Sequence, residues 1–230
     1  MSEHAAGDAA PEGRTLRHLV GGAVWSDLLT RAYERSHPAG ATLLRQDEPG
    51  THVLALVSGV AKVVRRERDG ALTLLAFRGP GELLGEVAVL DDQTRSASVH
   101  AISRCVVGVV TKADFLRFTT ERDLFPVLVR YALAKLRESD QARGGGDVAE
   151  RIAATLVALA DMAAPAPHLP GGPLDLALTR HELAQHLRLS RNTISSALTA
   201  LEPLGVRPGR GHIVVGDPAA LRRVVAGGGV

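Results

Sequence analysis

Two short clusters of residues carry side chains suited to binding a phosphorylated ligand. Gly85 and Glu86 close a glycine-containing turn, and Arg95 and Ser96 follow nine residues after the glutamate. A glycine turn lets backbone amides approach an anion closely, and the planar fork of an arginine suits a phosphate. The Ser96 hydroxyl adds a donor, and the Glu86 carboxylate would accept a hydrogen bond from a sugar hydroxyl. These residue types predict a sugar-phosphate site; the alternative is a Glu86–Arg95 ion pair, since buried charges are usually paired.

A second set of polar residues lies near the C-terminus. Thr179 and Glu182 have the spacing of a capping box, which predicts a short helix through Leu187. Ser190 is the expected cap of a second helix, from Arg191 to about residue 203. Two capped helices joined by a tight turn indicate a helix-turn-helix, and residues 205–216 indicate a β-hairpin wing after it. The residue types expected to bond base edges or phosphates are Thr179, Ser190, Arg191, Asn192, Thr193, Ser195, Ser196 and Arg210.

The distribution of charge supports a nucleic-acid partner for this segment without proving one. The chain of 230 residues has a formal net charge of only +2. From residue 165 onward, however, seven arginines face four acidic residues. The alternative is a small helical domain that packs against a partner protein while its arginines are merely solvated.

The elements that must position these residues differ along the chain. Residues 37–110 contain short apolar runs between recurring glycines, which predicts an antiparallel sandwich or barrel-like roll, with Asp69-Gly70 as a hairpin turn. Residues 123–143 contain no glycine and have apolar residues at helical spacing, with Pro126 in the first turn. This long helix has a broad apolar face, which either packs on its own domain or forms a dimer seam. The predicted fold class is therefore α+β.

A triple glycine at residues 144–146 is the clearest boundary, because glycines are costly to hold helical. Asp147 is the expected cap of the helix that follows. We therefore predict a flexible N-terminal segment over 1–23, a sensor domain over 24–122, a long helix over 123–143, a hinge over 144–146 and a DNA-binding domain over 147–230.

Composition excludes several classes of protein. Hydrophobic residues make up 45% of the chain, which is ordinary for globular domains, and no window approaches 18 uninterrupted apolar residues. The lone Cys105 excludes a disulfide framework. We find no Ser/His/Asp arrangement, metal-spaced histidine cluster or P-loop. We therefore expect no catalytic residues, no metal and no required cofactor, and a cytoplasmic location without membrane contact.

The two motifs together resemble one family. Gly85-Glu86 followed by Arg95-Ser96-Ala97 is similar to the phosphate-binding cassette of cyclic-nucleotide-binding domains. Residues 189–195, Leu-Ser-Arg-Asn-Thr-Ile-Ser, are similar to the recognition helix of the Crp/Fnr transcription regulators. Both occur in the family's order and are joined by a long helix, so the resemblance covers about residues 28–221. It implies a β-roll sensor, a dimerisation helix and a winged helix-turn-helix.

The resemblance also implies roles. Glu86 would hold the ribose 2′-hydroxyl, and Gly85, Arg95 and Ser96 would hold the cyclic phosphate of an allosteric ligand, cyclic AMP. Ser139 and Asp140 on the long helix would meet the purine. The implied partners are palindromic double-stranded DNA, a second copy of the chain and RNA polymerase. Two alternatives stay open: a DNA-binding regulator with another effector or none, and a signalling or protein-interaction module that does not bind DNA.

Overall fold

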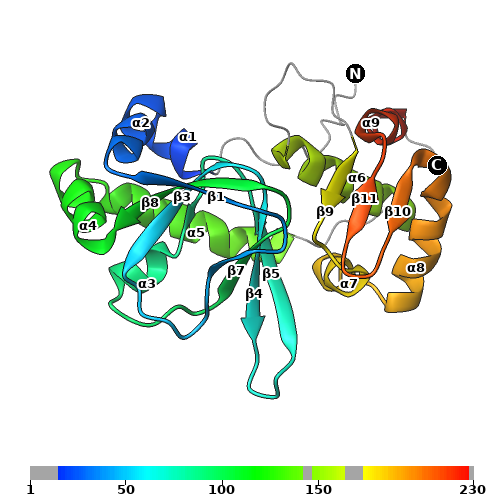
Figure 1. The fold of residues 1–230 in the computed structure, drawn as a ribbon, viewed down its shortest axis with the longest axis horizontal. Helices are drawn as coiled ribbons and strands as arrows, with labels where there is room; N and C mark the ends of the chain where they lie inside the picture. The colour runs from blue at the N-terminus through cyan, green and yellow to red at the C-terminus, as the bar shows by residue number, and fades with distance from the viewer. Residues whose placement is uncertain (1–14, 142–146, 164–172, 228–230) are drawn as a thin grey trace, which may run out of the picture.

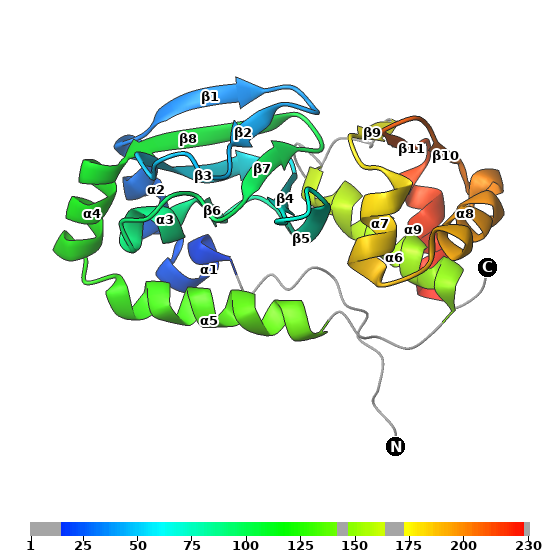
Figure 2. The ribbon, with the colours of Figure 1, turned by 90° about the horizontal axis from the view of Figure 1, so that it is seen from below.

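The computed structural model describes residues 15–141, 147–163 and 173–227. A β-roll with its covering helices forms one part of the molecule, and a smaller domain of helices and a short sheet lies beside it (Figure 1). Helix α5 runs along the roll, on the side where α1 also lies (Figure 2). This arrangement confirms the α+β class, with an N-terminal antiparallel roll, a long helix and a C-terminal winged helix-turn-helix.

The roll consists of two antiparallel four-stranded sheets. The first sheet has the order β1-β8-β3-β6, with bounds Tyr33–His37, Cys105–Thr111, His52–Ser58 and Leu83–Leu84. The second has the order β2-β7-β4-β5, with bounds Thr42–Leu44, Ser98–Ala101, Ala61–Arg66 and Leu72–Arg78. Leu56, Val107 and Val99 belong to the apolar cluster between them. Aliphatic side chains, rather than aromatic ones, therefore fill the space between the two sheets.

The predicted turn at Asp69-Gly70 is present but longer than two residues. Strand β4 ends at Arg66 and β5 starts at Leu72, and Glu67 N–H donates to Ala71 O at 2.8 Å across the loop between them. Gly70 lies in the left-handed region at φ +83° and closes the loop.

The N-terminal segment differs from the expectation of a flexible stretch over 1–23. Helix α1, Leu16–Val20, is capped by the Thr15 hydroxyl, and α2 follows over Gly22–Thr30. Leu16 is buried, and Arg17 N–H donates to Gly81 O at 3.0 Å. Residues 16–23 are therefore ordered by burial against the roll; residues 1–14 lie outside the described part of the chain.

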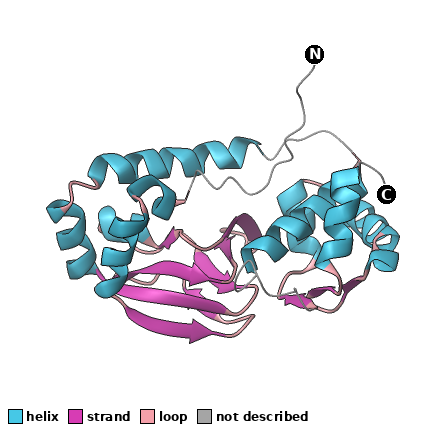
Figure 3. Cartoon of the chain, turned by 90° about the horizontal axis from the view of Figure 1, so that it is seen from above, coloured by secondary structure: helices cyan, strands magenta, loops and turns pink. Residues whose placement is uncertain are grey.

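Three more helices cover the roll (Figure 3): α3 (Glu86–Leu90), α4 (Lys112–Glu121) and α5 (Phe125–Gln141). The long helix begins two residues later than predicted because Asp123 has a left-handed backbone, with φ +48°. Its Leu128 and Tyr131 pack into the roll core. A second apolar stripe on α5 is exposed: Phe125, Val129, Leu133 and Leu136.

The smaller domain, which we call the reader, is built around a helix-turn-helix. Its helices are α6 (Val148–Ala163), α7 (Arg180–Leu187), α8 (Arg191–Ala200), the 3-10 turn η2 (Glu202–Leu204) and α9 (Pro218–Gly227). The wing strands β10 (Val206–Pro208) and β11 (Ile213–Val215) pair with β9 (Leu174–Leu176) in the order β10-β11-β9. The sequence did not predict β9. The predicted hinge at 144–146 lies outside the described residues, so the domain boundaries remain predictions.

The reader is packed firmly on the second sheet of the roll. Leu74, Phe77 and Ile102 of the roll share one buried cluster with Leu183 and Leu187 of the reader. Polar contacts reinforce this interface. Lys62 Nζ lies 2.6 Å from Glu182 Oε1, and the Gln185 amide bonds to Leu74 N at 2.9 Å and Leu72 O at 2.7 Å.

No helix of the described part of the chain is long and apolar enough to cross a membrane.

Candidate functional site

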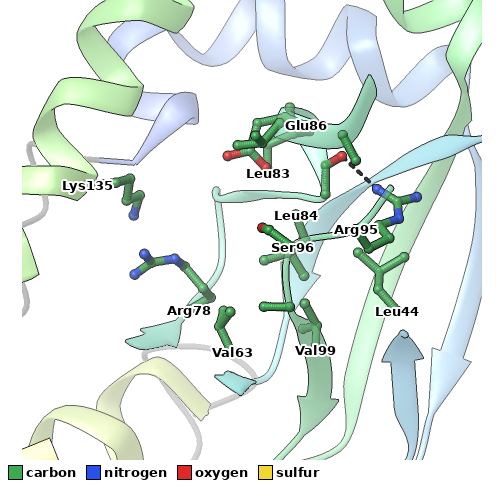
Figure 4. A pocket seen from close by; sticks show the side chains of 14 residues that line it. Leu44, Val63, Arg78, Leu83, Leu84, Glu86, Arg95, Ser96, Val99 and Lys135 are labelled. Atoms are coloured by element: carbon green, nitrogen blue, oxygen red, sulfur yellow. Dashed lines mark hydrogen bonds between the residues drawn. The ribbon is translucent and has the colours of Figure 1, made fainter. Parts of the chain in front are cut away.

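Residues of the first predicted cluster line a cavity of about 200 Å³ between the roll and α5 (Figure 4). The cavity is lined by Leu44, Val63, Arg78, Leu83, Leu84, Gly85, Glu86, Val87, Ala88, Arg95, Ser96, Ala97, Val99 and Lys135. The structure thus brings Gly85, Glu86, Arg95 and Ser96 to one site, although they come from two separate segments. The hydrogen-bonding groups of these residues determine what kind of molecule can bind there.

Gly85 is required by the geometry of this wall. It has a left-handed backbone, with φ +78°, and it immediately precedes α3. A Cβ built on Gly85 would lie 2.1 Å from Arg95 Nη1, so any larger residue here would have to displace the guanidinium. The glycine therefore permits both the turn into α3 and the close approach of the arginine.

Arg95 is buried, with 4% of its surface exposed, and is held by backbone carbonyls. Its Nη1 donates to Gly85 O at 2.6 Å and its Nη2 donates to His52 O at 2.5 Å. Burial lowers the pKa of Arg95, while the charges of Glu86 and Glu48 oppose that shift. A guanidinium has five N–H donors, so three remain after these two bonds. The alternative of a direct Glu86–Arg95 ion pair is not found among the described residues.

Glu86 and Ser96 supply the other polar groups of the wall. Burial raises the pKa of Glu86, against the lowering effects of its own backbone N–H, Arg78 and Arg95. The Ser96 side chain is exposed, and its hydroxyl makes no hydrogen bond to another described residue. Both groups can therefore accept or donate a bond to a molecule in the cavity.

A charged group at the α5 side of the cavity was not predicted. The buried Glu82 carboxylate contacts Lys135 Nζ of α5, lies 3.6 Å from Arg78 Nε, and accepts from Gly79 N–H at 2.6 Å. Figure 4 shows Arg78 and Lys135 together on one side of the cavity, with Arg95 on the opposite side. Lys135 lies on the same helical stripe as Tyr131, which is the one sequence signal that could have pointed to it.

Ser139 and Asp140 lie on the backbone of α5, close to its end at Gln141. Their side chains lie outside the description, so their assignment to a purine stays a prediction.

The second predicted cluster lies on the reader. The capping box of α7 is confirmed, with Thr179 Oγ1 accepting from Glu182 N–H at 3.1 Å and Glu182 Oε2 accepting from Thr179 N–H at 2.8 Å. The Thr179 hydroxyl also bonds to Glu182 Oε2 at 2.9 Å, so it is occupied within its own helix end. Thr179 is therefore the N-cap of α7, as predicted.

Helix α8 is capped as predicted, since Ser190 Oγ accepts from Thr193 N–H at 3.1 Å. Its inner side is apolar, with Ile194 and Leu198 buried. Of the remaining residues predicted to contact DNA, four on or beside α8 and one on the wing are exposed: Ser190, Arg191, Asn192, Ser196 and Arg210. The other two, Thr193 and Ser195, are half-buried.

Exposed arginines lie on α8, in the turn before it and on the wing. On the roll, Arg31, Arg117 and Arg122 are paired with carboxylates, whereas the exposed arginines at 66, 68, 104 and 130 have no carboxylate partner among the described residues. Four exposed reader arginines form neither an ion pair nor a side-chain hydrogen bond with any residue that the structure describes: Arg188, Arg191, Arg207 and Arg210. Exposed cations gathered around a helix-turn-helix are the pattern that binds a polyanion.

No group of three or more metal-ligating side chains occurs within residues 15–141, 147–163 and 173–227.

Comparisons with known proteins match a known domain to each of the two regions of the chain that contain the clusters. The cyclic nucleotide-binding domain matches residues 34–122, and the Crp-like helix-turn-helix domain matches residues 150–224. The chain is 31% identical over 198 residues to the cyclic AMP receptor protein of Thermus thermophilus, covering 84% of this chain and 88% of that protein. It is 26% identical over 192 residues to the cAMP-activated global transcriptional regulator CRP of Salmonella typhimurium, covering 81% and 90%.

Solved structures show the same fold. A transcriptional regulator of the CRP family from Thermus thermophilus has a TM-score of 0.59 at 22% identity, covering 84% of this chain and 96% of that one. FixK2 from Bradyrhizobium japonicum has a TM-score of 0.56 at 22% identity, with the same coverage.

Proposed function

Since the chain belongs to the Crp family of transcription regulators, we propose that cyclic AMP in the roll cavity controls its binding to a palindromic DNA site. The chain is a regulator with a cyclic-nucleotide-binding domain and a helix-turn-helix domain. The observation that carries the ligand proposal is the convergence of Gly85, Glu86, Arg95 and Ser96 on one cavity.

Each cavity residue has a role that its chemistry allows. Arg95 has three N–H donors that no described residue occupies and that could bond to the cyclic phosphate. The Gly85 backbone and the Ser96 hydroxyl would add bonds to it. Glu86 accepts a bond from the ribose 2′-hydroxyl. Ser139 and Asp140 contact the purine from α5, from one protomer or its partner.

The size of the cavity suggests how the ligand acts. At about 200 Å³ it is smaller than typical ligand pockets, which span about 300–1,000 Å³. We propose that nucleotide binding requires α5, whose Lys135 contacts Glu82 beside the cavity, to shift relative to the roll. A ligand that fits one arrangement better than another shifts the population toward it.

Isothermal titration tests the ligand. Wild-type protein should bind one cyclic AMP per chain, whereas Ser96→Ala and Glu86→Gln should bind it more weakly. Ser36→Ala, on the exposed edge strand β1, is the matched control. The absence of heat with both cyclic AMP and cyclic GMP at high protein concentration would remove the ligand proposal. Arg95 is a poorer test residue, because its loss also leaves the Gly85 and His52 carbonyls without a donor.

For DNA, we propose that α8 enters the major groove. Arg191, Asn192 and Ser196 would contact base edges, while Thr179, Ser190, Thr193, Ser195 and Arg210 would contact phosphates or support these contacts. The four unpaired arginines around α8 favour DNA over a protein partner. RNA polymerase remains a predicted further partner.

We also propose that the chain is a homodimer through α5. Its outer stripe leaves Val129 58% exposed and Leu136 67% exposed, which is costly for large apolar side chains in water. Leu133→Glu should convert the dimer to a monomer in sedimentation equilibrium. Leu75→Glu, at an exposed apolar residue of β5, should leave the dimer intact. A wild-type monomer at micromolar concentration would contradict this proposal.

A further inference from the structure

The turn between α7 and α8 contains an arginine in a backbone conformation that favours glycine. Arg188 is the C-cap of α7 and has φ +54° and ψ +43°. Its N–H donates to Gln185 O at 3.2 Å, and Leu189 N–H donates to Ala184 O at 2.9 Å, so hydrogen bonds fix the turn on both sides. Left-handed geometry brings a Cβ close to the following carbonyl, and glycine avoids that contact.

Arg188 is exceptional even among residues with positive φ. In the described part of the chain, the others apart from glycines are Asp47, Asp92 and Asp123. Aspartate tolerates this region because its short side chain can bond to its own backbone. The long arginine side chain does not stabilise its own backbone in this way, so the presence of arginine at this position needs another explanation.

The position of Arg188 beside the N-terminus of α8 suggests an explanation. It precedes Ser190, the cap of α8, by two residues, so the two Cα atoms are at most about 7.6 Å apart. Its side chain is exposed and, among the described residues, has no carboxylate partner. The flexible reach of an arginine from this turn covers the region beside the N-terminus of α8, where DNA phosphates would lie.

We propose that Arg188 is a DNA phosphate contact, retained at a left-handed position because its guanidinium adds affinity that glycine could not supply. This inference rests on the proposed DNA binding by α8. The competing explanation is purely structural: a cation near the C-terminus of α7 interacts favourably with the helix dipole. The two explanations predict opposite effects of glycine on stability and different effects on DNA binding.

The test compares Arg188→Gly, Arg188→Gln and Arg188→Lys in the full-length protein. DNA is selected from a random pool with the wild type, and affinity is measured across a salt series. Each lost phosphate contact makes the slope of log K against log salt shallower by about 0.9 per protomer. This counterion effect alone weakens binding about fourfold per protomer at 0.2 M salt. We expect these losses for Gly and Gln, restoration by Lys, and a higher melting temperature for Gly.

Arg117→Ala, an exposed arginine on α4 at the opposite end of the molecule from the reader, is the charge-matched control (Figure 1). Wild-type affinity and salt slope in both Arg188→Gly and Arg188→Gln would overturn the inference. So would a lower melting temperature in Arg188→Gly with unchanged DNA binding, because that result identifies a helix-end role. If the wild-type protein itself binds no DNA, the proposed function fails, and the inference fails with it.

Discussion

At the scale of single residues, Gly85 and Arg95 occupy the same wall of the cavity and depend on each other. The absent side chain of Gly85 leaves room for Arg95 Nη1, and the Gly85 carbonyl accepts a hydrogen bond from it. Replacement of Gly85 by alanine would therefore displace the guanidinium as well as strain the turn. The sequence predicted that Gly85 and Arg95 share one site, because both residue types suit the binding of a phosphate. Arg78 and Lys135 were not predicted, because their approach to Glu82 depends on how α5 packs on the roll.

The single thiol of the chain gives a prediction about reactivity. Cys105 is fully buried, its Sγ lies 3.3 Å from Val60 O, and burial raises its pKa to about 11. At pH 8 only about one thiol in a thousand would be ionised even if it were accessible. Labelling by a thiol reagent should therefore proceed at the rate of unfolding and become rapid in denaturant. Stoichiometric labelling of the native protein within seconds would show that this account of the strand is wrong.

A histidine in the second sheet predicts a pH dependence. Burial, followed by the charge of Lys62, lowers the pKa of His100 below its ordinary 6.5, while Glu182 opposes the shift. Below pH 6.5 the folded protein therefore binds fewer protons than the unfolded chain, and the free energy of unfolding falls as pH decreases. His100→Gln, which can keep the bond to Thr42, should reduce this loss between pH 6.5 and 5 in urea unfolding. The exposed His18→Gln is the control, and identical pH profiles for wild type and His100→Gln would contradict the assignment.

At the scale of elements, features that depend on local contacts were predicted from the sequence, whereas features that depend on long-range contacts were not. The caps at Thr179, Ser190 and Asp147 were predicted because each is a contact between residues two or three apart. Strand β9 and the ordering of α1 were missed, since each depends on a partner far away in the sequence. Strand β9 forms because Val215 and Ile213 of β11 pair with it, and α1 because Leu16 is buried in the roll core.

The contact of α7 with β5 is the clearest such long-range case. Strand β5 is at the edge of its sheet, and the Gln185 amide pairs with its outer N–H and C=O in the way a neighbouring strand would. Gln185→Ala should lower the free energy of unfolding by about 1–3 kcal/mol, because it leaves the part-buried Leu74 N–H without a partner. Gln93→Ala, at an exposed residue, should have little effect. Equal stability of the two variants would show that water replaces Gln185 without loss.

At the scale of the whole molecule, strands β4 and β5 join the cavity to the reader. Val63 of β4 and Arg78 of β5 line the cavity, while their neighbours Lys62 and Phe77 contact Glu182 and His186 of the reader. Successive residues of a strand face opposite sides, so one strand serves both surfaces. A ligand that displaces either strand therefore also displaces the surface on which α7 packs.

We propose that cyclic AMP binding and specific DNA binding are coupled in this chain, and selection of DNA from a random pool with and without cyclic AMP measures this coupling. We expect enrichment of a palindromic site, with half-sites about 10 base pairs apart or a multiple of that, and only when cyclic AMP is present. Ser96→Ala should require more cyclic AMP for the same enrichment. Equal enrichment without the nucleotide, or no enrichment in either pool, would show that the two binding events are not coupled.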